Sequence, residues 1–271
     1  MKTLVTHINP HLDDIVGIWF VKKFMPDFKD SKVEFISAEQ GKSGLADSED
    51  KLFIGVGMGK FDEHKGDVDE CAGSLVWKYL KQKNYAPNDQ ISQKALDLLS
   101  EWNRLIDTGK APITQYSEFS VQSFIRSQDS QDTSSQRSVE LGMEILDRIF
   151  EILKTEQIAL KDWEERQEFE TKFGKTVAVK SAAVDRAFCK REGRADLYLL
   201  FDPEHTAVQF FTPSFSIDLE PIYIKVKEQD PEASWFLHQS HHMVICGSSS
   251  APESKKTKLN FEQLIEIAKT T

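Results

Sequence analysis

The chain has 271 residues, of which 39% are hydrophobic and 29% are charged, and it carries a formal net charge of −10. Its length and apolar content predict a globular protein of two compact units, and its negative charge argues against a broad basic face that would bind a long nucleic-acid duplex. No run approaches the roughly 20 apolar residues of a membrane span and the first residues do not resemble a signal peptide, so we expect a cytoplasmic protein without a membrane partner.

The first half of the chain alternates between strand-like and helical patterns. Strands are predicted at residues 3–8, 32–38 and 52–56, and helices at residues 12–24, 69–83 and 91–106. This alternation predicts an α/β fold with a doubly wound, mainly parallel sheet. Because ligands of such sheets bind beyond the carboxyl ends of the strands, the loops after these strands are the expected place for a site.

The second half begins with a change of composition. Residues 127–138 are rich in Ser, Gln and Asp without an apolar period, which indicates a linker. A long helix is predicted next at residues 139–173, then strand-like runs at 197–201, 207–211, 222–226 and 243–246, and a last helix at 261–268. We therefore expect an N-terminal domain (1–126), a linker with a long helix (127–174) and a smaller C-terminal α/β domain (175–271).

Two clusters of histidines and acids follow predicted strands. Imidazole and carboxylate groups together suit a divalent ion such as Mn²⁺, and clusters at neighbouring strand ends face one crevice. Taken singly, each residue has a structural interpretation, for example as a helix cap. The residues are His7, His11, Asp13 and Asp14 after the first strand and Asp62, Glu63 and His64 after the third, with Asp107 ending a later apolar stretch.

These motifs resemble those of a known family, the DHH phosphoesterases. His7-x-Asn9-Pro10-x-x-Asp13 resembles the opening HxNPDxD motif of that family, Asp62-Glu63-His64 resembles its DHH motif, and residues 106–109 resemble its downstream aspartate motif. Residues 234–238 and 243–248 are similar to the second domain of one branch, the melanocyte-proliferating-gene type exonucleases. The resemblance therefore extends over nearly the whole chain.

The resemblance implies a Mn²⁺-dependent phosphohydrolase, with Mg²⁺ as the alternative ion, that cleaves a phosphoester of a nucleotide or short single-stranded oligonucleotide by metal-activated water. It implies that His64 faces the phosphate and that Asp62 orients its neighbours. The implied metal ligands are His7, His11, Asp13, Glu63 and Asp107. In the C-terminal domain the candidate substrate contacts are His238, His241, His242 and Ser248, with an ordinary polar turn as the equally weighted alternative.

The chain departs from the family pattern at three positions. His11 stands where the family has Asp and Glu63 where it has His, although both are competent ligands. Gly55 falls where the pattern has a carboxylate that bridges two ions, so one or two bound ions remain open, with Asp14 and Asp62 as the residues that could compensate. The alternative function is that of a degenerate, catalytically weak member that binds nucleotide or metal.

Overall fold

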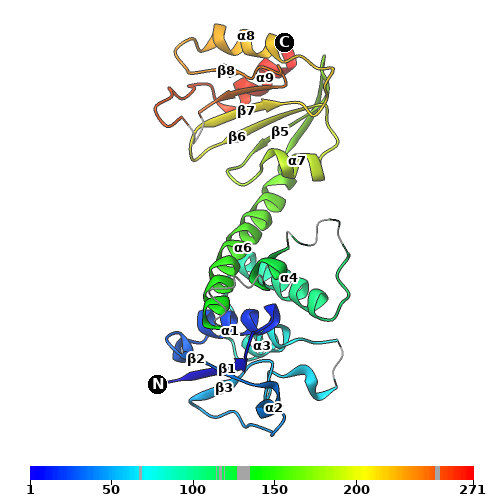
Figure 1. The fold of residues 1–271 in the computed structure, drawn as a ribbon. Coiled ribbons are helices and arrows are strands. Elements are labelled where there is room, and N and C mark those ends of the chain that lie inside the picture. Colours follow the sequence, from blue (N-terminus) through cyan, green and yellow to red (C-terminus); the bar gives the residue numbers. More distant parts are fainter. Residues whose placement is uncertain (67–68, 114, 116–117, 119, 127–134, 248–250) are drawn as a thin grey trace. The chain divides into compact units, whose positions relative to one another are not determined.

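The computed structural model describes residues 1–66, 69–113, 115, 118, 120–126, 135–247 and 251–271, and it divides into two compact units, residues 1–154 and 155–271 (Figure 1). The first unit contains a parallel sheet and the second a mixed sheet, so the predicted α/β class is confirmed. Helix α6 (Ser135–Glu164) begins in the first unit and ends in the second.

Three parallel strands form the sheet of the first unit in the order β2-β1-β3. Helices α1 and α3 lie over one face of this sheet, and the short α2 lies on the other (Figure 1). The strands are β1 (Thr3–His7), β2 (Lys32–Ile36) and β3 (Lys51–Phe53), and the helices are α1 (Leu12–Phe24), η1 (Pro26–Phe28), α2 (Ala38–Gly41), η2 (Glu63–Lys65), α3 (Ala72–Gln82), α4 (Gln90–Asp107) and α5 (Val121–Arg126).

Helix α1 is the centre of the first unit's core. Every residue from Leu12 to Val21 is buried, because the helix packs on β1, α3 and α4 at once. Phe20 stacks on Trp77 of α3 with ring centroids 5.2 Å apart. Because α1 is surrounded by these elements, it needs apolar side chains on all of its sides.

The strand order places a crevice at the carboxyl edge of this sheet. Because β2 and β3 flank β1 on opposite sides, the chain changes its direction of winding at β1, which is where open α/β sheets bind ligands. Strand β3 ends at Phe53, earlier than predicted, and a single bridge joins Ile54 to Phe61. That bridge places residues 62–64 close to the end of β3.

The second unit is a six-stranded sheet in the order β4-β5-β6-β7-β9-β8, in which only β5 and β6 pair in parallel among the described strands. Helices α8 and α9 pack on one face of the sheet, and α7 with the end of α6 packs on the other. The elements are β4 (Gln167–Thr171), β5 (Gly174–Lys180), α7 (Arg186–Glu192), β6 (Leu197–Asp202), β7 (Ala207–Phe211), α8 (Glu220–Gln229), β8 (Phe236–Leu237), β9 (Met243–Cys246) and α9 (Phe261–Thr270).

Two predictions in the second half of the chain are wrong. The long helix ends at Glu164, and residues 167–171 form β4, which pairs antiparallel with β5 through a turn that uses Gly174 at φ 101°. Residues 222–226 belong to helix α8 and not to a strand, because Pro221 stands in the first turn of that helix. Ile222 and Val226, four residues apart, are both fully buried, whereas Ile224 between them is 50% exposed.

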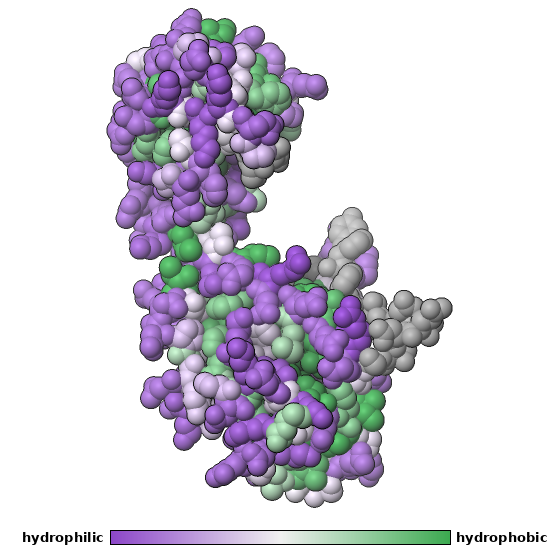
Figure 2. Space-filling view, turned by 90° about the vertical axis from the view of Figure 1, so that its left-hand side faces the viewer, coloured by the Kyte–Doolittle hydropathy of each residue, from purple (hydrophilic) through white to green (hydrophobic). Residues whose placement is uncertain are grey.

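In the described ranges, no helix is both long enough and apolar enough to cross a bilayer. The face shown in Figure 2 is mostly hydrophilic, with apolar side chains scattered over it. Scattered apolar side chains of this kind are normal for a protein surface.

The helical assignment of residues 222–226 is tested by a matched pair of substitutions. We expect Ile222→Ala to lower the free energy of unfolding by about 2–4 kcal/mol, because it leaves a cavity in the core. Ile224→Ala changes an exposed position and should cost less than about 0.5 kcal/mol. Chemical denaturation of both variants measures the difference; equal losses would indicate a strand, in which residues 222 and 224 share one face.

Candidate metal centre

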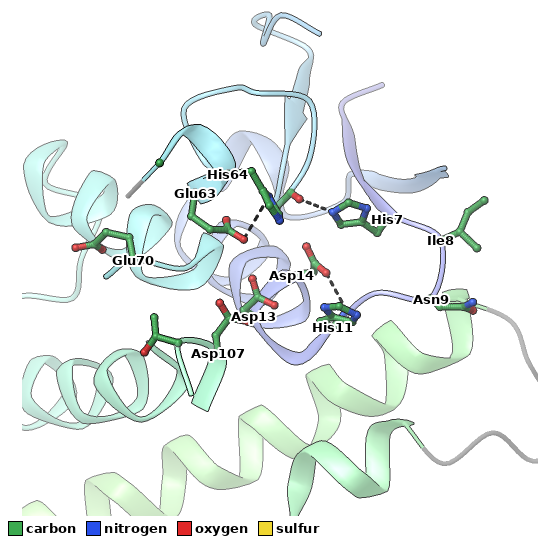
Figure 3. A pocket seen from close by; sticks show the side chains of 13 residues that line it. His7, Ile8, Asn9, His11, Asp13, Asp14, Glu63, His64, Glu70 and Asp107 are labelled. Atoms are coloured by element: carbon green, nitrogen blue, oxygen red, sulfur yellow. Dashed lines mark hydrogen bonds and ion pairs between the residues drawn. The ribbon is translucent and has the colours of Figure 1, made fainter. Parts of the chain in front are cut away.

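A cavity of about 720 Å³ opens at the carboxyl edge of the first unit's sheet. Its wall is built by the loop after β1, the first turn of α1, the segment after β3 and the end of α4. In Figure 3 the carboxyl groups of Asp13, Asp14, Glu63 and Asp107 converge, whereas Glu70 and Asn9 lie apart. The lining residues are His7, Ile8, Asn9, His11, Asp13, Asp14, Gly55, Glu63, His64, Gly66, Glu70, Asp107 and Thr108.

All five predicted metal ligands therefore line one cavity, and two overlapping groups of residues there are close enough to share an ion. Ligand atoms of Asp13, Glu63 and Asp107 lie within 4.8 Å of one another. A second group, within the same limit, is His11, Asp13 and Asp14. Asp13 belongs to both groups, which makes it the central carboxylate of the cavity.

His7 lies at the cavity in a different way. Its Nε2 is 2.5 Å from the carbonyl oxygen of Gly55, a hydrogen bond that ties the end of β1 to the segment after β3. This bond leaves Nδ1 as the nitrogen for an ion, and the His7 ring lies 6.2 Å from the ring of His64. His7 is thus a structural link as well as a candidate ligand.

The carboxyl groups are held in surroundings that disfavour their charge. Asp13 is 4% exposed and Asp14 is 2% exposed, and burial raises the pKa of both, with repulsion from Asp13 raising the pKa of Asp14 further. Burial, followed by repulsion from Asp13, raises the pKa of Glu63 to about 7 and the pKa of Asp107 to about 6. The cavity therefore favours the uptake of protons or of a cation.

The donor set fits a divalent cation. Glu63 Oε2 is buried and has no hydrogen-bond partner, and such an orphaned oxygen is costly unless an ion or another partner meets it. Among the described residues no Lys or Arg forms an ion pair with any of the four converging carboxyl groups. Carboxylate and imidazole donors together suit Mn²⁺ or a similar ion.

Helix geometry supports the same interpretation for Asp107. This residue is the last of α4, where the negative end of the helix dipole disfavours a carboxylate. By contrast, Asp13 and Asp14 lie in the first turn of α1, where the positive end of the helix dipole favours negative charge. Asp107 therefore stands where a carboxylate lowers helix stability, which a bound cation would offset.

Asp62 lies behind His64, which lines the cavity, and the two side chains form a pair. The Asp62 side chain, 4% exposed, accepts hydrogen bonds from the backbone N–H of Met58 at 2.6 Å and of His64 at 3.0 Å, and its Oδ1 lies 2.7 Å from His64 Nδ1. Burial opposes the Asp62 charge, but these bonds outweigh it and lower its pKa. Burial likewise opposes a charged His64, but the bond to Asp62 outweighs it and raises the pKa of His64.

Gly55 lies against Asp14. A Cβ built at Gly55 would overlap Asp14 Oδ1 and lie 3.1 Å from Asp14 Cγ, and the backbone there has φ +65°. The space for a side chain at position 55 is therefore already filled by a carboxylate. Asp14 is outside the predicted ligand set, and the signal for it was the adjacency of two acids in one helical turn, where a cap requires only one.

The candidate substrate contacts lie in the second unit. His241 Nδ1 is 3.0 Å from Asp218 Oδ1, and His238 Nδ1 is 2.8 Å from Ser240 Oγ. His241 and His242 line a cavity of about 400 Å³, and the His242 ring meets that of Phe215 at 5.5 Å. His238 is not part of that lining, and Ser248 lies outside the described residues.

No family model and no curated protein matches the chain. Among solved structures, the pGpG-specific phosphodiesterase PggH from Vibrio cholerae aligns over 98% of both chains, with 12% identity and a TM-score of 0.28. RecJ from Thermus thermophilus, in complex with Mg²⁺, aligns over 99% of this chain and 49% of its own, with 12% identity and a TM-score of 0.35. An exopolyphosphatase-related protein from Bacteroides fragilis aligns over 98% and 89%, with 9% identity and a TM-score of 0.24. Similarity at this level carries no argument about function, which depends on the site itself.

The raised pKa values predict how the metal-free protein responds to pH. Glu63 and Asp107 have pKa values of about 7 and about 6, above their ordinary values. At pH values between the ordinary and the raised pKa, the folded state therefore binds more protons than the unfolded state. The resulting stability is present at lower pH and is lost as pH rises through the folded-state values. We expect the free energy of unfolding in EDTA to fall by roughly 1–3 kcal/mol from about pH 5.5 to about pH 8. Most of this change should come from Glu63, because Asp107 is exposed and solvent screens its interactions.

Urea denaturation at several pH values measures this dependence. Glu63→Gln is the control, since removing the charge should flatten the profile while keeping the shape of the side chain. A metal-free protein whose stability rises over the same interval would contradict the assignment of buried, mutually repelling carboxyl groups.

Proposed function

We propose that the chain is a metal-dependent phosphohydrolase that cleaves a phosphoester of a nucleotide or a short single-stranded oligonucleotide, and that it belongs among the DHH-type phosphoesterases its motifs resemble. One observation carries the proposal: side chains from three separate motifs converge in one cavity whose carboxyl groups have no Lys or Arg partner among the described residues. Such a cavity would repel a phosphate by itself, so cations must come between the carboxylates and the substrate.

The residues that would hold cations are Asp13, Glu63 and Asp107 in one group, and His11, with His7 through Nδ1, on the other side of Asp13. Mn²⁺ is the proposed ion and Mg²⁺ the alternative, since both accept carboxylate donors while the imidazoles favour Mn²⁺. When bound, such ions supply Lewis acidity toward the phosphate and lower the pKa of water.

His64 is the proposed catalytic residue at the substrate. Its Nδ1 faces Asp62, which fixes the ring and leaves Nε2 for a phosphate oxygen. The raised pKa of His64, caused by the Asp62 bond against the effect of burial, favours the protonated ring that can donate to an anion. Asp62 is thus a positioning residue, anchored by two backbone N–H groups.

In the second unit, His238, His241, His242 and Ser248 are the proposed substrate contacts. The alternative function is binding of a nucleotide or metal with little or no turnover, and Gly55 is the observation that favours it, because no side chain extends into the cavity from this position. Metal analysis of the purified protein and a Mn²⁺-dependent hydrolysis screen over nucleotides, short oligonucleotides and pyrophosphate separate the two. Turnover indicates the enzyme, and tight binding without turnover indicates the alternative.

Asp13→Asn tests the central carboxylate. We expect Mn²⁺-dependent hydrolysis to fall on the order of 100-fold or more, because the amide removes the charge that both ligand groups share. Folding should be preserved, since the substitution keeps the shape of the side chain and relieves repulsion. Asp30→Asn, at an exposed position outside the cavity lining, is the matched control; full turnover of the Asp13 variant would remove this residue from the site.

A further inference from the structure

We propose that the cavity forms two cation subsites that share one helix carboxylate, Asp13, and that Asp14 supplies the carboxylate that position 55 lacks. The inference rests on the proposed function, because it assumes divalent cations in this cavity. In this arrangement, Asp13 and Asp14 on the first turn of α1 take the place of a bridging carboxylate at position 55. It also favours two ions over one.

The space at Gly55 is the first observation. A Cβ at this position would overlap Asp14 Oδ1, so the Asp14 carboxylate stands where a side chain of residue 55 would begin. A side chain at position 55 and the observed carboxylate of Asp14 therefore exclude each other. The chain has glycine at one position and a buried acid at the other, which preserves a carboxylate at that point of the cavity.

The overlap of the two ligand groups is the second observation. The His11, Asp13 and Asp14 atoms form one group and the Asp13, Glu63 and Asp107 atoms form the other, each within 4.8 Å. Two cations at neighbouring positions repel each other, and an anionic ligand between them offsets that repulsion. Asp13 is the carboxylate that these two groups share, while Glu63 also joins a third group with Asp62 and His64.

A purely structural role does not account for Asp14. Its Oδ2 accepts the backbone N–H of His11 at 2.8 Å, as part of a capping arrangement at the start of α1. Gln40 and Gln263 perform the same task on α2 and α9, where each accepts the backbone N–H of the N-cap residue while exposed to solvent. Asp14 is instead 2% exposed beside a second acid, which is a costly place for a cap.

An exchange of the carboxylate between the two positions tests the proposal. The variants are Asp14→Asn, Gly55→Asp, the double variant Gly55→Asp/Asp14→Ala, and the matched control Gly55→Asn/Asp14→Ala, which has the same shape without the charge. Asp and Asn tolerate the left-handed backbone at position 55 better than other residues with side chains. Calorimetric titration with Mn²⁺ gives the number of ions and their affinities, and the thermal transition with and without Mn²⁺ reports folding.

We expect two Mn²⁺ ions in the unsubstituted protein. Asp14→Asn should keep one ion and bind the second at least about tenfold more weakly, which corresponds to about 1.4 kcal/mol. Gly55→Asp alone should destabilise the metal-free protein, because two carboxylates compete for one space. The double variant with Asp at position 55 should regain the second ion, and the double variant with Asn should not.

The outcomes separate this inference from the proposed function. If the unsubstituted protein binds no Mn²⁺, the proposed function fails. If it binds two ions and Asp14→Asn binds both with unchanged affinity, only the inference fails, and a stoichiometry of one in the unsubstituted protein overturns it as well. Asp14→Asn is nearly isosteric and decides the question even if a double variant does not fold.

Discussion

Four carboxyl groups that converge at the edge of a three-stranded sheet, two of them buried, are the constraint on which the first unit depends. Each group loses hydration on burial and each repels the others, which raises the pKa values of Glu63 and Asp107 to about 7 and about 6. The first turn of α1 offsets part of this cost for Asp13 and Asp14 through its backbone N–H groups and dipole. Protons or cations must offset the rest, so the free energy of folding is coupled to what the cavity binds.

Only a few elements of the fold are needed to position these carboxyl groups. Helix α1 is buried along most of its length, so its first turn is fixed against the end of β1. The bridge from Ile54 to Phe61 brings the segment with Glu63 to the same edge. Asp62 is hydrogen-bonded to both the backbone N–H and the ring Nδ1 of His64. Residues behind a metal site orient the side chains in front of them by bonds of this kind. A rigid core thus positions donors that would otherwise repel one another.

Much of the first unit could be predicted from sequence because its signals are local. The strand before His7 and the helix from Leu12 to Phe24 were predicted with boundaries close to those observed, and alternation of strands and helices located the crevice. The second half was harder: the pattern at 222–226 fits a strand as well as a helix, and only the exposure of Ile224 between the buried Ile222 and Val226 distinguishes them. Strand β5 and helix α7 were not predicted. The relation between Gly55 and Asp14 depends on a contact between distant segments, which no spacing in the sequence reveals.

The central claim is that this cavity is a divalent metal centre, and anomalous X-ray scattering at the manganese edge from crystals grown with Mn²⁺ tests it most directly. The account predicts anomalous peaks within ligand distance of Asp13, one of them between Glu63 and Asp107 and a second toward His11 and Asp14. Ordered crystals at saturating Mn²⁺ with no peak in the cavity, and with Glu63 and Asp107 bonded to protein groups instead, would contradict it.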